Sequence, residues 1–357
     1  MKPDSIELIR ELSQANGAPG FEDEVNQIIR RFSGDFCSLE EDNLRNLYLS
    51  RQGERAGGPA VMIEAHSDEV AFMVQSINPN GALRLVPLGS WLPATVLAQR
   101  VRVLSSRGQY LPGVVAAKPP HFLDPGQRDQ AVKLKDMTID LGATSRQEVT
   151  ERLGIEPGAP VLPESSFHFD SEREVILGKA LDNRLGCAAV AETMQALQGL
   201  DLKVRPAGVI STQEEVGARG VQVAVRRVQP QAAVIYEGTP ADDTLMEDWA
   251  IQGGMGRGPQ IRHLDPSMIT NPRFLAFARQ VAQDNKIEFQ DAVRTGGATD
   301  GAKINLANQG VPAIVIGIPI RYAHSPHCFA SLKDYRAAVR WGVEILKKLD
   351  QETLEGF

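Results

Sequence analysis

The chain has 357 residues, of which 42% are hydrophobic and 23% are charged, a composition typical of globular proteins. Its formal net charge of -7 argues against nucleic-acid or anionic-membrane partners, which favour a basic surface, and no apolar run is long enough to span a membrane. The acidic N-terminal residues do not resemble a secretory peptide, and three cysteines (Cys37, Cys187 and Cys328) cannot form a disulfide framework. We therefore expect a cytoplasmic protein, and its length predicts two domains.

The N-terminal region predicts two amphipathic helices followed by a buried strand. Apolar residues recur at helical spacing over residues 5–14 and 21–33, on either side of a turn rich in Gly and Pro. The apolar run at residues 59–65 is long enough for a buried strand and too short for a helix. It ends at His66, so this imidazole is expected at the carboxyl end of a strand.

Residues 70–166 differ from the rest of the chain in their pattern of apolar runs and turns. Short β-rich runs at residues 83–86, 101–104 and 113–117 alternate with Gly and Pro turns, with little helical periodicity. This pattern predicts a β domain inserted into the first one. The expected division is a discontinuous domain of residues 1–69 and 167–357, with the insertion at residues 70–166.

An α/β pattern resumes after the insertion. Helices are expected over residues 182–197, 220–228, 271–284 and 332–349, and strands over residues 207–212, 232–236 and 312–318. Helices that alternate with apolar strands predict an α/β fold, in which helices flank a mixed, mostly parallel sheet.

Five potential metal ligands lie just past predicted strands or at the start of a predicted helix. They are His66, Asp182, Glu215, Glu237 and His324. Because binding sites of open α/β sheets form outside the carboxyl ends of the strands, these distant residues can converge on one crevice. Two imidazoles and three carboxylates suit zinc, cobalt or manganese, and their charge nearly balances two dications once a hydroxide bridges them.

Five segments of the chain resemble motifs of one known family. They are residues 65–70 (AHSDEV), 178–187 (GKALDNRLGC), 212–217 (TQEEVG), 296–300 (GGATD) and 321–325 (RYAHS). In this order and at these spacings they resemble the tetrahedral aminopeptidase (TET) family of dinuclear metallopeptidases, which includes glutamyl and deblocking aminopeptidases and proteins labelled endoglucanases. The resemblance covers essentially the whole chain. It implies a phosphorylase/peptidase-like fold with a small β-barrel-like insertion.

The resemblance also implies a role for each matching residue. His66 and Glu237 would bind one divalent ion, Glu215 and His324 the other, and Asp182 would bridge the two. Asp68 would orient the His66 ring, and Glu214 would be the general base. Many members carry Asp at position 237, so Glu237 departs from the usual pattern.

The implied activity is hydrolysis of the N-terminal residue from short peptides. A metal ion lowers the pKa of bound water from about 15.7 toward about 7, and Glu214 would pass the proton to the departing amine. The implied assembly is a homo-oligomer in which the inserted β domains form dimers and six dimers form a hollow dodecamer. No nucleic acid or membrane partner is expected.

Several alternatives remain open from the sequence. A metal-dependent deacylase of N-acylated small molecules is one, an endoglucanase is a second, and a non-catalytic binding or scaffold protein is a third. Residues 296–300 are either a tight turn or a backbone wall of the substrate cleft. Arg262 could bind an acidic first residue or form a structural ion pair with Asp265. His327 rivals His324 as a ligand, but the RYAHS motif selects His324.

Overall fold

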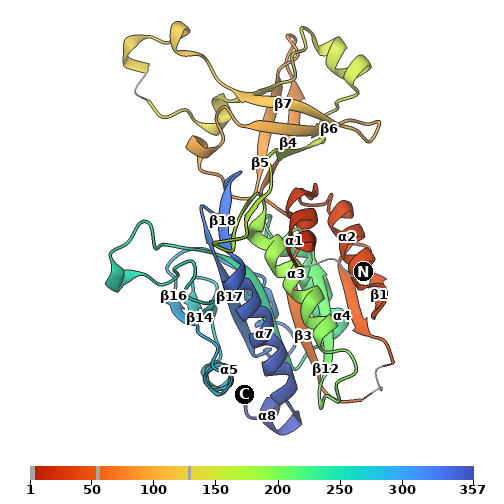
Figure 1. Ribbon diagram of the computed structural model, residues 1–357. Coiled ribbons are helices and arrows are strands. Elements are labelled where there is room, and N and C mark those ends of the chain that lie inside the picture. Colours follow the sequence, from red (N-terminus) through yellow and green to blue (C-terminus); the bar gives the residue numbers. More distant parts are fainter. Residues whose placement is uncertain (1–4, 54–56, 128–129) are drawn as a thin grey trace.

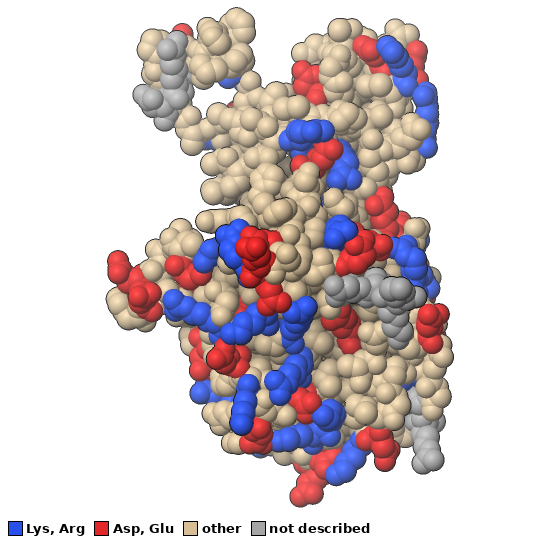
Figure 2. Space-filling model, in the orientation of Figure 1, with Lys and Arg blue, Asp and Glu red and all other residues tan. Residues whose placement is uncertain are grey.

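The computed structural model describes residues 5–53, 57–127 and 130–357, and Figure 1 shows a larger α/β part below a smaller β-barrel. Within these residues, no helix has both the length and the apolar character needed to cross a membrane. On the face shown in Figure 2, Lys and Arg side chains alternate with Asp and Glu over the α/β part, while much of the barrel surface is neutral.

A mixed sheet of twelve strands, counted over the residues described, forms the centre of the α/β part. Its strands are β1 (Cys37–Glu41), β2 (Leu47–Arg51), β3 (Ala60–His66), β10 (His168–Asp170), β11 (Val175–Gly178), β12 (Arg205–Ser211), β13 (Ala232–Pro240), β14 (Gln260–Asp265), β15 (Met268–Ile269), β16 (Gln290–Val293), β17 (Ala313–Arg321) and β18 (Cys328–Ser331). The central strands β12, β3, β13 and β17 run parallel, and most outer pairings are antiparallel. The carboxyl ends of four strands therefore meet at one edge of the sheet.

Helices cover both faces of this sheet. They are α1 (Ser5–Gln14), α2 (Asp23–Ser33), α3 (Leu181–Ala196), α4 (Arg219–Val228), α5 (Pro272–Asp284), α6 (Gly301–Ile304), α7 (Leu332–Lys348) and α8 (Gln351–Glu355). Side chains of a strand alternate between the two faces, so Val234 and Tyr236 of β13 join the core beneath α3 and α7, while Ala233 and Ile235 join the core beneath α4. The central strands are therefore apolar at nearly every position, as expected for a sheet covered on both sides.

The β-rich segment between β3 and β10 closes on itself as a barrel. Its strands are β4 (Ala71–Ile77), β5 (Leu83–Leu88), β6 (Arg100–Leu104), β7 (Tyr110–Ala116), β8 (Thr138–Asp140) and β9 (Pro160–Pro163). They pair antiparallel in the order β4-β5-β8-β7-β6-β9, around a core that includes Phe72, Val103 and Val161. The expected α/β fold with a barrel-like insertion is confirmed.

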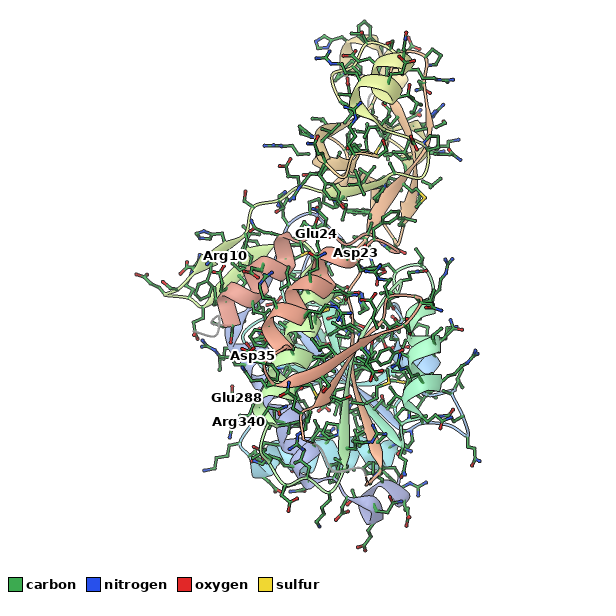
Figure 3. The ribbon with its side chains drawn as sticks, turned by 90° about the vertical axis from the view of Figure 1, so that its right-hand side faces the viewer. Arg10, Asp23, Glu24, Asp35, Glu288 and Arg340 are labelled. Atoms are coloured by element: carbon green, nitrogen blue, oxygen red, sulfur yellow. The ribbon has the colours of Figure 1, made fainter. Side chains whose placement is uncertain are left out.

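Short helical turns connect these elements. They are η1 (Pro93–Thr95), η2 (Pro120–Phe122), η3 (Pro125–Gln127), η4 (Leu134–Asp136) and η5 (Glu148–Leu153, a π-helix) in the barrel part, and η6 (Asp248–Ala250) in the α/β part. Figure 3, turned by 90° from Figure 1, shows α1 and α2 side by side, with Asp23 and Glu24 at the barrel-proximal end of α2. The start of α2 thus lies at the level where the two parts meet.

Candidate metal centre

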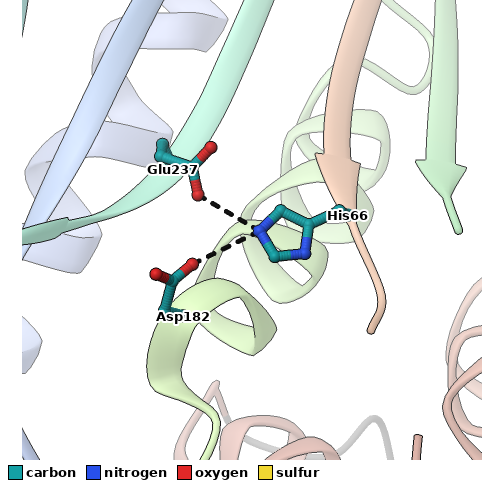
Figure 4. Close-up of side chains that lie close together, drawn as sticks. All are labelled: His66, Asp182 and Glu237. Atoms are coloured by element: carbon teal, nitrogen blue, oxygen red, sulfur yellow. Dashed lines mark ion pairs between the residues drawn. The ribbon is translucent and has the colours of Figure 1, made fainter. Parts of the chain in front are cut away.

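His66 lies at the centre of the first group of possible metal ligands. It is the last residue of β3 and is buried, and its Nε2 atom lies 3.3 Å from both Asp182 Oδ1 and Glu237 Oε1 (Figure 4). Asp182 comes from the first turn of α3 and Glu237 from β13, so three separate elements meet here. One ligand atom from each residue lies within 4.8 Å of the others, which is close enough to share one ion.

A second group shares Asp182 with the first. His324 Nε2 lies 3.5 Å from Asp182 Oδ2 and 3.5 Å from Glu215 Oε1. Glu215 follows β12 and His324 follows β17, so both come from loops at the carboxyl ends of parallel strands. Asp182 thus directs one carboxylate oxygen to each group, which is the arrangement of a bridging ligand.

Glu237 lies within a strand, not just past the end of one. The sequence predicted that the strand ends at residue 236 and that Glu237 lies just past it. Instead β13 continues to Pro240, because its backbone stays paired with β17 in parallel register as far as Ile320. Glu237 therefore lies inside a strand and is 5% exposed, so its longer side chain is held between neighbouring strands.

The chemistry of these donors fits two divalent cations. Asp182 Oδ1 is buried and accepts no hydrogen bond from the described residues, so it is available to an ion. Burial raises the pKa of Glu237 to about 7 and that of Glu215 to about 8, and the neighbouring Asp182 carboxylate adds to both shifts, while the nearby imidazoles oppose them. Burial disfavours the charged form of His66, but surrounding carboxylates, Glu237 foremost, raise its pKa well above the usual value. Two dications would supply the missing positive charge.

Asp68 contacts both the first imidazole and the loop after β12. Its Oδ1 atom lies 3.4 Å from His66 Nδ1, and its backbone oxygen lies 3.2 Å from the same nitrogen. The carboxylate also accepts the backbone N–H groups of Glu214 at 2.9 Å and Glu215 at 3.0 Å. Asp68 therefore contacts His66 as the sequence suggested, and it additionally fixes the backbone that carries the two glutamates.

A cavity of about 800 Å³ opens over both groups. It is lined by all five possible ligands, by Glu214, and by residues 296–299 of the GGATD segment. Ser211 Oγ lies 2.7 Å from Glu64 Oε1 and 2.6 Å from Asp300 Oδ2, so this segment is tied to the sheet beneath it. Of the two interpretations of residues 296–300, the cleft wall agrees with this geometry.

Two other sequence-based candidates lie outside the ligand groups. His327 Nδ1 lies 3.1 Å from Ser165 Oγ, and this imidazole belongs to neither group. Arg262 lines the cavity, but its guanidinium donates to Asp265 Oδ2 at 2.9 Å and lies 3.3 Å from Thr239 Oγ1. The ion pair with Asp265 is therefore the arrangement that the protein adopts.

The barrel part contributes a contact that the sequence did not reveal. His324 Nδ1 lies 2.9 Å from the backbone oxygen of Ser90, in the segment after β5, and this oxygen can accept the Nδ1–H. Such a bond leaves Nε2 free to face the ligand group. A backbone carbonyl carries no signature in the amino-acid sequence, so no motif could have pointed to Ser90.

The chain is similar to proteins described as glutamyl aminopeptidases. The family model of the M42 glutamyl aminopeptidases matches residues 46–341. The glutamyl aminopeptidase of Lactococcus lactis subsp. cremoris (strain MG1363) is 31% identical, with 97% of each chain covered.

Solved structures of TET peptidases are also similar to this chain. A TET aminopeptidase from a marine sediment archaeon of the Thaumarchaeota matches with a TM-score of 0.94 and 36% identity, covering 99% of this chain and 98% of the other. The TET1 peptidase of Pyrococcus horikoshii, which can assemble into a tetrahedron or a large octahedral shell, matches with a TM-score of 0.87 and 26% identity over 97% of this chain and all of the other.

Proposed function

The chain belongs to the M42 glutamyl aminopeptidase family and is a metal-dependent aminopeptidase, and we propose that its reaction takes place at the paired ligand groups joined by Asp182. The observation that carries this proposal is the position of the Asp182 carboxylate. One of its oxygens faces His66 and the other faces His324, and the oxygen facing His66 accepts no hydrogen bond from the described residues.

We assign each of the five possible ligands to one or both of two metal sites. His66 and Glu237 would hold one divalent ion and Glu215 and His324 the other, and Asp182 would offer one carboxylate oxygen to each group. Imidazole and carboxylate donors suit zinc or cobalt first and manganese next. Metal analysis of protein purified without added chelator, compared with protein reloaded with each ion in turn, identifies the native metal.

The protein side chains around the ions have separate tasks in this proposal. When bound, the two ions acidify a water molecule and polarise the scissile carbonyl group. Glu214 accepts the proton from that water and later donates it to the departing amine. Asp68 keeps the His66 ring and the backbone of residues 214–215 in place while this proton moves. The backbone of residues 296–299 forms a wall against which the substrate lies.

The substrate is proposed to be the N-terminal end of a short peptide. A cavity of about 800 Å³ has the size of pockets that enclose small ligands, so a few residues fill it. The guanidinium of Arg262 is engaged by Asp265, so this side chain gives no support for an acidic first residue. Which first residue is preferred is a question for a panel of aminoacyl anilides.

The barrel is proposed to mediate assembly. In this proposal residues 1–69 and 167–357 form the catalytic domain, and residues 70–166 form an inserted domain that joins two copies, with six dimers in a hollow dodecamer. The family resemblance and the assembly of the TET1 peptidase of P. horikoshii support it. Mass measurement in solution tests it, and a stable monomer would count against it. We place the enzyme in the cytoplasm, a reducing compartment that suits a chain with only three cysteines, all of them buried.

The decisive experiment removes and restores the metal ions. Hydrolysis of aminoacyl anilides should stop on chelation and return on addition of zinc, cobalt or manganese. Cellulose and N-acylated amino acids serve as comparison substrates. Cellulose hydrolysis that survives chelation would support the endoglucanase alternative. Metal-dependent hydrolysis of N-acylated substrates, without cleavage of anilides, would support the deacylase instead.

A further inference from the structure

Four consecutive backbone amides hold the loop that carries Glu214 and Glu215. Each N–H group donates to a side chain from another part of the fold. The bonds run from Thr212 to Asn46 Oδ1 at 3.0 Å, from Gln213 to Glu22 Oε1 at 3.2 Å, from Glu214 to Asp68 Oδ1 at 2.9 Å and from Glu215 to Asp68 Oδ2 at 3.0 Å. The direction of both glutamate side chains therefore depends on three distant residues.

Glu22 holds the member of this loop with the least favourable backbone. Gln213 has a φ of 58°, in the left-handed region that residues other than glycine rarely adopt. Its N–H donates to the carboxylate of Glu22, which is 1% exposed and also accepts the N–H of Gly20 at 2.8 Å. A buried backbone N–H that loses its acceptor is costly, so this bond offsets part of the cost of the left-handed turn.

The segment that precedes Glu22 keeps its place through other contacts. The carbonyl of Gly17 accepts the backbone N–H of Glu69 at 3.0 Å, and the carbonyl of Ala15 accepts Lys179 Nζ at 2.9 Å. Both donors are buried, and neither hydrogen bond involves Glu22 or residues 212–215. The segment that carries Glu22 is therefore held by hydrogen bonds other than those that the Glu22 side chain accepts.

We propose that Glu22 is a positioning residue for catalysis, although it lies about 190 residues before the proposed base and belongs to neither ligand group. Its carboxylate fixes the turn at Gln213, and this turn sets the angle at which the next two side chains enter the cavity. The inference rests on the proposed roles of Glu214 as base and Glu215 as ligand. It assigns the N-terminal helix pair a part in the reaction in addition to its part in the core.

Three substitutions of Glu22 test this proposal, with Glu24 as the matched control. Glu24 lies in the first turn of α2, directly after Asp23 and the N-cap residue Glu22 (Figure 3), and its carboxylate accepts the backbone N–H of Asn16 at 2.8 Å, so E24A also removes a carboxylate from a backbone amide. That bond lies outside residues 212–215. E22A removes the acceptor at Gln213, E22Q keeps an acceptor oxygen in the same place, and E22D withdraws the carboxylate by one methylene.

Full-length protein loaded with zinc is assayed for kcat, KM, thermal midpoint and the rate of zinc release to a chromophoric chelator. E22A should lower kcat about 10- to 100-fold with little change in KM, and it should release zinc faster, because the loop no longer holds both glutamates. E22Q should recover most of the lost kcat, and E22D should fall between E22A and the wild type. E24A should lower the thermal midpoint without these changes in kcat and zinc release.

Several results would overturn the inference. One is a kcat and a zinc release rate for E22A that match those of E24A. Another is an E22Q variant as impaired as E22A, since the acceptor oxygen would then be irrelevant. If E22A does not fold, E22D decides, and a wild-type kcat in E22D rejects the proposal. Failure of the proposed function is distinguishable, because it would appear in the wild type as activity that survives chelation.

Discussion

Replacing Glu214 by Gln tests the division of labour between two adjacent glutamates. Glu214 lines the cavity but belongs to neither ligand group, whereas Glu215 belongs to the group of His324. The substitution keeps the size of the side chain and leaves the backbone N–H that donates to Asp68 unchanged. It therefore removes the proton acceptor and leaves the ligands in place.

The magnitude follows from the role of a general base. Such a group contributes about 10²- to 10⁴-fold to the rate, so the barrier should rise by about 2.7–5.4 kcal/mol at about 1.36 kcal/mol for each factor of ten. We expect kcat to fall by this factor while KM stays close to the wild-type value, because the lost interaction belongs to the transition state. The assay is steady-state hydrolysis of an aminoacyl anilide, with the zinc content of the same sample measured by mass spectrometry.

Glu215→Gln is the matched control, since it changes the neighbouring residue in the same way. It should lower both the activity and the metal content, because a ligand is weakened. A Glu214→Gln variant with a kcat near that of the wild type would refute the assignment of the base. Equal metal loss in the two variants would refute the separation of base from ligand.

Three further changes have expected outcomes. Chelation should lower the thermal midpoint, and added zinc should restore it, because bound ions stabilise the folded state that gathers the carboxylates. Glu69→Gln should lower the free energy of unfolding by about 3–5 kcal/mol, because it breaks buried ion pairs with Lys179 at 2.5 Å and Arg184 at 3.1 Å. With an entropy of unfolding of about 2.1 cal/mol/K per residue over 357 residues, the melting temperature should fall by about 4–7 °C. Gly89→Ala should speed zinc release to a chelator, because a Cβ at this position would lie 2.9 Å from Glu215 Oε2.

Two variants serve as controls for the last two changes. Glu7→Gln breaks an ion pair with Arg10 that is 42–45% exposed, and it should shift the melting temperature little. Gly108→Ala places a Cβ at a similar positive φ with no atom within 4 Å, so it should release zinc at the wild-type rate. If Glu69→Gln melts like Glu7→Gln, or Gly89→Ala releases zinc like Gly108→Ala, the corresponding argument is wrong.

Much of the architecture could be predicted because buried strands and amphipathic helices have periodic signatures. The apolar run at residues 59–65 gave β3, and the helical spacing of residues 5–14 gave α1 with the same bounds. Strands at the margins of the sheet lacked such signals. β15 has two residues and β16 has four, so their pairing with β14 is decided by tertiary contacts that a local pattern does not encode.

The candidate site was accessible to sequence reasoning where side chains with distinctive chemistry follow strands. His66 and His324 were selected in this way and Asp182 at the start of a predicted helix, and the structure brings the three together. The contributions of Glu22 and Ser90 could not be selected. Glu22 acts through a backbone amide almost 200 positions away, and Ser90 acts through its own carbonyl, so neither leaves a local pattern.

The contact between Ser90 and His324 bears on whether the barrel is an exchangeable module. In Figure 1 the barrel projects from the α/β part like a separate unit that could be replaced or removed as a whole. Residues 89 and 90, however, reach back from the end of β5 into the cavity, one beside Glu215 and one against the His324 ring. A chimaera that replaces the whole insertion would leave His324 Nδ1 without its acceptor. A replacement barrel should therefore keep a backbone carbonyl at the position of Ser90, so that the His324 ring retains its acceptor.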